Sequence, residues 1–163
     1  MEHFLNYFKS KYNLSFDIYR ISNVYGEGQN TTKGLGIINT FIEKIISEKK
    51  INIFGNGENV RNYVYVKDVA QLLSVSIEAD IQKSNIYNLS SNDTLSINEL
   101  VEIIKKIIPE HFDVIYEKQR QSDNPAVYLN NSRILNDHPT FHFTPIEKGI
   151  LETYLFIKNN KKQ

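Results

Sequence analysis

One stretch decides the fold of this chain: Ile53-Phe54-Gly55-Asn-Gly57-Glu-Asn-Val-Arg61-Asn-Tyr63-Val-Tyr-Val-Lys-Asp68. Residues 51–54 are predicted to form a short strand, and the segment 55–57, with its two glycines, is typical of a turn. Residues 60–66 are rich in Val and Tyr, which favour a second strand. A helix is predicted over 67–79, with an aspartate in its first turn, where a carboxylate suits the helix dipole. The stretch therefore predicts a strand, a turn, a strand and a helix in immediate succession.

Helices and strands also alternate on both sides of this stretch. Apolar spacing and capping signals predict helices over 2–12, 35–49, 97–108 and about 145–158. Short apolar or alternating runs predict strands over 16–21, 85–89 and 112–117. Residues 22–34 are predicted to be a loop, and capping boxes are predicted at Ser96-Ile-Asn-Glu99 and Thr144-Pro-Ile-Glu147. The alternation of strands and helices argues for an α/β fold.

The composition indicates one globular domain over residues 1–163. The chain is 40% hydrophobic and 12% aromatic, which separates it from disordered chains. Its 19 basic and 19 acidic residues balance, so we expect no nucleic acid as a partner. The chain has no cysteine, no apolar run of membrane-spanning length and no signal-peptide pattern at Met1, so we expect a cytoplasmic protein without membrane contact. His138 and His142 flank Pro139, which argues against a helical metal site.

A second segment, Arg20-Ile-Ser-Asn23-Val-Tyr25-Gly26-Glu-Gly28-Gln29, forms a pair of motifs with the stretch at 53–68. Together they resemble the second half of the NAD-dependent epimerase/dehydratase family, the extended short-chain dehydrogenases that act on nucleotide sugars. Asn62 stands where that family usually has Asp, and Lys67 stands where an acid is common. The resemblance covers nearly the whole chain, from about residue 2 to about residue 157.

The resemblance implies the C-terminal part of a Rossmann-type extended short-chain dehydrogenase, including its small substrate-binding lobe. Residues 2–21, 51–54 and 85–90 would belong in part to the Rossmann sheet. A ligand would lie in the cleft between the two halves. The N-terminal Rossmann half, which we expect to be missing from this chain, would complete that cleft as a partner.

Four residues in or directly beside the two motifs are implied to bind a nucleotide sugar. Arg61 matches the family arginine that holds the diphosphate, a role for which the forked guanidinium is suited. Asn52 and Phe54 match positions that meet the nucleobase, although Phe54 fits a core position equally well. Asn23 matches the asparagine that bonds the substrate near the reacting sugar, and as an asparagine it also fits a turn.

A third segment, Arg120-Gln-Ser-Asp123-Asn-Pro125, resembles the family more loosely. Arg120 is implied to be a second arginine that binds the phosphate, and Asp123 is implied to contact ribose or to orient the loop. Asp123 fits an N-cap or an Asx turn equally well. Arg20 is expected to brace its strand through a buried ion pair rather than to touch the ligand.

No catalytic residue is identified in this chain. The family uses a tyrosine with a lysine four residues on, and three pairs have that spacing: Tyr7/Lys11, Tyr63/Lys67 and Tyr154/Lys158. None lies where the family has it, just before the helix at 2–12, so the three tyrosines are interpreted as packing residues. The pairs Gly26/Gly28 and Gly55/Gly57 are interpreted as turns rather than as a dinucleotide-binding loop. NAD is therefore expected in the parent enzyme and not as a stable ligand of this chain alone.

Two hypotheses about function follow. In the first, the chain is the UDP- or dTDP-sugar-binding portion of an NAD-dependent epimerase or dehydratase, similar to UDP-glucose 4-epimerase and inactive alone. In the second, it is a non-catalytic nucleotide-sugar or partner-binding module from a split gene. Whether the chain is itself an enzyme, and whether the parent is an epimerase, a dehydratase or a reductase, stays open. The family also implies a homodimer through the helix at 2–12, which alternatively covers its own sheet.

Overall fold

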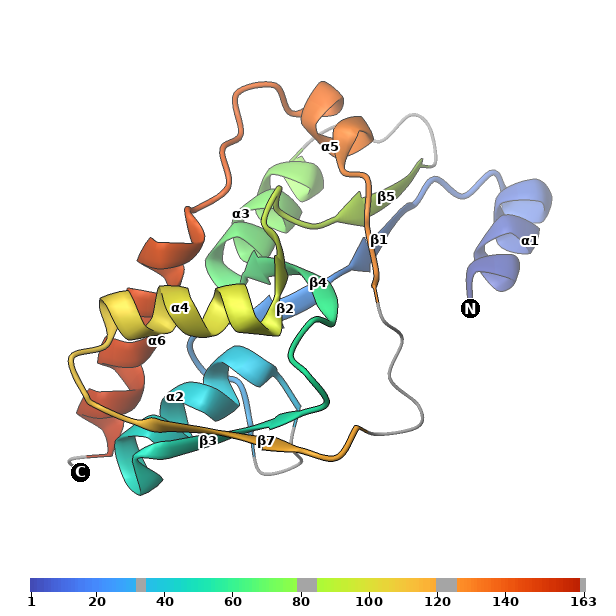
Figure 1. The fold of residues 1–163 in the computed structure, drawn as a ribbon. Helices are drawn as coiled ribbons and strands as arrows, with labels where there is room; N and C mark the ends of the chain where they lie inside the picture. The colour runs from blue at the N-terminus through green and yellow to red at the C-terminus, as the bar shows by residue number, and fades with distance from the viewer. Residues whose placement is uncertain (32–34, 79–84, 120–125, 162–163) are drawn as a thin grey trace.

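The computed structural model describes residues 1–31, 35–78, 85–119 and 126–161, which form an α/β fold (Figure 1). The helices are α1 (Glu2–Tyr12), α2 (Ile37–Glu48), α3 (Val66–Glu78), α4 (Ile97–Ile107), α5 (Ser132–Asp137) and α6 (Ile146–Asn160). The strands are β1 (Asp17–Ile21), β2 (Asn23–Tyr25), β3 (Lys50–Phe54), β4 (Val60–Tyr65), β5 (Asn85–Leu89), β6 (Thr94–Ser96) and β7 (Asp113–Glu117). Every predicted helix and strand is present, with ends shifted by at most two residues.

Among the described residues, the strands pair in three groups. β1 and β5 run parallel, with Asp17 opposite Asn85. β4 lies between β2 and β6, parallel to the first and antiparallel to the second. β3 and β7 form the third group, also parallel. The expectation that residues 51–54 share a sheet with β1 and β5 is therefore wrong within the described ranges, because β3 pairs with β7.

Two apolar clusters hold these groups together. The larger packs α2, α4 and α6 around β3 and β4. The smaller joins β4 to α3, β5 and α5. As the apolar spacing predicts, α2 buries Ile38, Phe41, Ile42 and Ile45, whereas Ile46 is only partly buried. Because β4 contributes to both clusters, the side chains along this strand are held in place from both sides.

The two predicted capping boxes have different outcomes. The first is confirmed, because Ser96 and Glu99 each accept a hydrogen bond from the backbone N–H of the other. The second is wrong, because Pro145 stands at the N-cap of α6 and no side chain among the described residues caps this helix. Thr144 instead donates from its hydroxyl and its backbone N–H to Asp68 of α3, at 2.7 and 2.9 Å. A buried carboxylate on a distant helix competes successfully for the group that would have formed the cap.

Short elements lie in segments where the sequence predicts none. Residues 23–25 form β2 because their backbone pairs in parallel with residues 63–65 of β4. β6 and α5 were also missed. Elements of three and six residues are too short to show a clear hydrophobic period.

Two predictions near the N-terminal end are corrected. Arg20 does pair with Glu2, at 2.7 Å, but the two side chains are 56% and 37% exposed, so the ion pair is not buried. Tyr7 is exposed on α1, whereas Tyr63 and Tyr154 are buried as predicted. None of the residues of α1 is buried, so this helix does not cover a sheet of its own chain. It lies to one side of the other elements in Figure 1.

Candidate functional site

One cavity of about 560 Å³ is lined by four of the residues that the motifs single out. Asn23 begins β2, Asn52 and Phe54 lie on β3, and Arg61 lies on β4. Asn52 and Phe54 are two residues apart, so their side chains project from the same face of β3. The volume is within the range of about 300–1,000 Å³ that is typical of small-molecule sites. The structure thus brings four predicted binding residues, from three strands, to one place.

Arg61 also lines a second cavity, of about 280 Å³. Asn23 and Arg61 line both cavities, and Ser22 and Leu129 add to the smaller one. Nη1 of Arg61 donates to the carbonyl oxygen of Val60 at 2.7 Å, which restrains the guanidinium. A cation that borders two cavities suits an elongated ligand with an anionic group at its centre.

Asn62, the residue after Arg61, forms hydrogen bonds with uncharged groups only, as far as the described residues show. Asn62 is buried, and its side chain donates to Thr94 at 2.6 Å and accepts from the N–H of Leu129 at 2.8 Å. Its backbone carbonyl accepts from the amide of Asn23 at 2.9 Å. An aspartate here would place a charge among these neutral groups, whereas an asparagine needs no counter-ion. Asn62 therefore carries no charge that would neutralise Arg61.

The larger cavity also contains polar residues that the sequence did not point to. Thr40 and Lys44 are four residues apart on α2 and share one face of that helix. Because both lie beside the apolar face of α2, the sequence pattern could have indicated that they border the cavity. Glu117 of β7 accepts a hydrogen bond from the amide of Asn52. No local pattern indicated Glu117, because only the pairing of β3 with β7 brings it to the cavity.

Tyr63 packs in the core as predicted, but it also lines the larger cavity. It is 1% exposed, and its hydroxyl has no hydrogen-bond partner within the described ranges. Burial raises the pKa of Tyr63 to about 12, against a smaller opposing effect of the Arg61 charge. A buried hydroxyl without a hydrogen-bond partner is energetically unfavourable.

The remaining predicted residues have other outcomes. Arg120 and Asp123 lie outside the described residues, so their binding roles stay predictions. Tyr154 of α6 donates to Glu110 at 2.8 Å and also contacts Lys158, in an ion-paired group that does not line either cavity.

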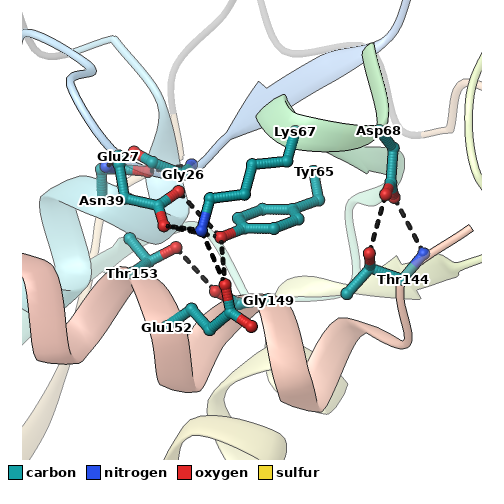
Figure 2. Close-up of polar contacts among 10 residues, drawn as sticks. All are labelled: Gly26, Glu27, Asn39, Tyr65, Lys67, Asp68, Thr144, Gly149, Glu152 and Thr153. Carbon is teal, nitrogen blue, oxygen red and sulfur yellow. Dashed lines mark hydrogen bonds and ion pairs between the residues drawn. The ribbon is translucent and has the colours of Figure 1, made fainter. Parts of the chain in front are cut away.

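A network of polar side chains fastens the end of β4 to α6, as Figure 2 shows. The hydroxyl of Tyr65 lies 2.7 Å from an oxygen of Glu27 and 2.9 Å from an oxygen of Glu152. The ammonium of Lys67 lies 2.7 and 2.8 Å from the same two carboxylates, and its bond is the largest effect that lowers the pKa of Glu152. The Tyr65 hydroxyl has one proton and can donate it to only one of the two carboxylates at a time, while the positive charge of Lys67 offsets the charge of both. The network holds the strand that carries the arginine of the cavity.

Comparison with known proteins identifies relatives over almost the whole chain. Residues 1–90 match the model of the NAD dependent epimerase/dehydratase family. A Methanocaldococcus jannaschii protein, provisionally named UDP-glucose 4-epimerase, is 31% identical over 163 residues, which cover 99% of this chain and 52% of the relative. The structure of UDP-glucose 4-epimerase with UDP-glucose from Thermotoga maritima gives a TM-score of 0.89 at 25% identity, over 98% of this chain and 51% of that one.

A second solved structure is similar to the same extent. UDP-N-acetylglucosamine 4-epimerase from Methanobrevibacter ruminantium, in complex with UDP-N-acetylmuramic acid, gives a TM-score of 0.88 at 27% identity. The match covers 98% of this chain and 51% of that one. The chain therefore spans about half the length of the relatives that it matches.

Solved structures of the same fold contain NAD. Gly55 and Gly57 lie between two strands, and Gly26 and Gly28 follow β2 well before α2 begins at Ile37. A dinucleotide pyrophosphate requires a glycine turn that opens a helix directly, so neither pair fits NAD. Within the described ranges, no group of three or more His, Cys, Asp or Glu side chains is arranged to hold a metal ion. In the same ranges, no helix has the length and apolar character that a membrane span requires.

Proposed function

Because this chain belongs to the NAD dependent epimerase/dehydratase family, we propose that it forms the C-terminal, nucleotide-sugar-binding portion of a UDP-sugar 4-epimerase. One observation carries the proposal, which is that the motif residues Asn23, Asn52, Phe54 and Arg61 line a single cavity. The relatives reported above are named as epimerases of UDP-sugars, which favours UDP over dTDP and epimerisation over dehydration.

The two cavities suggest how the ligand lies. The nucleoside occupies the larger cavity, where Phe41 and Phe54 offer apolar surface and Asn52 offers hydrogen-bonding groups. The diphosphate lies at Arg61, which borders both cavities. The sugar extends into the smaller cavity past Asn23. This order of base, diphosphate and sugar follows the order of cavity, cation and second cavity.

We also propose that the chain does not catalyse epimerisation alone. The reaction needs a hydride carrier and a group that exchanges a proton with a sugar hydroxyl. Neither glycine pair fits NAD, and the raised pKa of Tyr63, about 12, makes it a poor base near neutral pH. Turnover of UDP-glucose by the purified chain would contradict this proposal. Turnover restored by adding an N-terminal half from a relative would favour an enzyme portion over a non-catalytic module.

The binding site is tested by Arg61→Ala, with the Kd for UDP measured by calorimetry. Loss of the guanidinium leaves the diphosphate without its partner, which should cost about 2–4 kcal/mol. That cost corresponds to a Kd raised by roughly 30- to 1,000-fold. Arg20→Ala removes the same charge from an exposed ion pair and should leave the Kd unchanged. Equal Kd values for the two variants would refute the assignment of the cavity.

We further propose a homodimer through α1. Phe4 and Tyr12 are 68% and 61% exposed, and Tyr7 and Phe8 are also exposed on the same helix. An aromatic face on a helix with no buried residue is typical of an interface, and a face identical in two copies can pack against itself. Sedimentation should detect a dimer that Phe4→Ser weakens. A monomer at high concentration would contradict the proposal.

A further inference from the structure

A hydrogen bond between two polar side chains closes one wall of the larger cavity. Asn52 of β3 donates from its amide nitrogen to Oε1 of Glu117 on β7. Glu117 pairs with Phe54 in the parallel register of β3 and β7. Phe54 is two residues after Asn52, so the side chains of Asn52, Phe54 and Glu117 lie on the same face of the sheet. We infer that Glu117 is a positioning residue, which fixes the orientation of the Asn52 amide so that this amide recognises the edge of a uracil base. The inference rests on the proposed function, because it takes the cavity as the nucleoside site.

The chemistry of the two side chains decides which way the amide faces. The oxygens of a carboxylate only accept hydrogen bonds, so Glu117 must meet the NH2 group of Asn52 and not its carbonyl oxygen. One N–H is used by this bond. The second N–H and the carbonyl oxygen then form a donor beside an acceptor. Turning the amide over would set its oxygen against the carboxylate, leaving both acceptors unpaired, so the order of donor and acceptor is fixed.

A fixed order of donor and acceptor distinguishes uracil from cytosine, which have nearly the same shape. Uracil presents its N3–H donor beside the O4 acceptor, whereas cytosine presents the N3 acceptor beside the amino donor at C4. The order is reversed on the same edge of the ring. An amide held in one orientation therefore pairs with one base and opposes the other, while an amide that can turn over pairs with both. Discrimination of this kind is strong, because the wrong base leaves buried polar groups unpaired.

The test compares UDP and CDP binding to the 163-residue chain and to Glu117→Gln, by calorimetry. Gln has the shape of Glu but can both donate and accept, so it allows Asn52 to turn over. We expect the unmodified chain to prefer UDP by about tenfold or more, and the preference to fall toward none in the variant. Glu102→Gln removes the same charge from an exposed residue of α4 and should keep the original preference. A preference unchanged by Glu117→Gln would overturn the inference.

A double-mutant cycle separates action through Asn52 from direct contact with the base. In the Asn52→Ala background there is no amide to orient, so Glu117→Gln should not change the preference further. An equal effect in both backgrounds would overturn the positioning role. If the unmodified chain binds neither nucleotide, the proposed function itself fails. If it binds UDP and CDP equally, the nucleotide site stands and only the role of Glu117 is lost.

Discussion

Removal of one oxygen atom from Tyr63 should have opposite effects on stability and on ligand binding. The side chain is 1% exposed, and Tyr63→Phe keeps the ring and its packing. The hydroxyl is buried without a hydrogen-bond partner in the described part of the chain. Leaving such a group unpaired costs about 1–3 kcal/mol. We therefore expect Tyr63→Phe to raise the free energy of unfolding of the chain alone by about 1 kcal/mol, the low end of that cost.

The same change should weaken nucleotide binding. Tyr63 and Arg61 line the same cavity, so we expect an oxygen of a bound ligand to accept a hydrogen bond from the hydroxyl. Loss of one neutral hydrogen bond costs about 0.5–1.5 kcal/mol. The Kd for UDP should therefore rise by roughly two- to tenfold.

Urea denaturation with and without UDP measures both effects on one sample. Tyr154→Phe is the matched control, because Tyr154 is also buried but its hydroxyl donates to Glu110 at 2.8 Å. The control should lose about 1 kcal/mol of stability and keep its UDP affinity. If Tyr63→Phe is destabilised as much as the control, its hydroxyl has a partner in the protein and the reasoning fails. An unchanged UDP affinity would exclude the contact with the ligand.

Two further predictions concern the packing of α6. A methyl group added at Gly149 would lie 2.2 Å from the hydroxyl of Tyr25, so Gly149→Ala should lower the free energy of unfolding by about 1–3 kcal/mol. Tyr25→Phe should restore part of this loss in urea denaturation, and a Gly149→Ala variant as stable as the parent chain would disprove the close contact. The hydrogen bond with Lys67 lowers the pKa of Glu152 in the folded chain. The Glu152 carboxylate therefore stabilises the fold fully above its unfolded pKa of about 4.3, and this stabilisation is lost as the pH falls through the lower, folded pKa. Glu152→Gln should therefore reduce the fall of the urea midpoint below about pH 4, and parallel profiles would count against this ion pair.

The candidate site could be predicted in part. The motif match placed Asn23, Asn52, Phe54 and Arg61 at a ligand, and the structure gathers all four around one cavity. Glu117 could not be predicted, because it lies 65 residues from Asn52 and meets it only through the pairing of β3 with β7. The hydroxyl of Tyr63 was missed for a related reason, since no pattern in the sequence tells whether a buried group finds a partner.

The sequence by itself determined the helices, the longer strands and the turn at 55–57, because apolar spacing, capping and glycine geometry act between residues a few positions apart. Only the tertiary structure decided which distant groups meet. Thr144 leaves its own helix for Asp68, residues 23–25 become a strand beside β4, and Arg20 forms its ion pair at the surface. Each of these outcomes depends on the free energy of a contact between remote segments, which no local pattern contains.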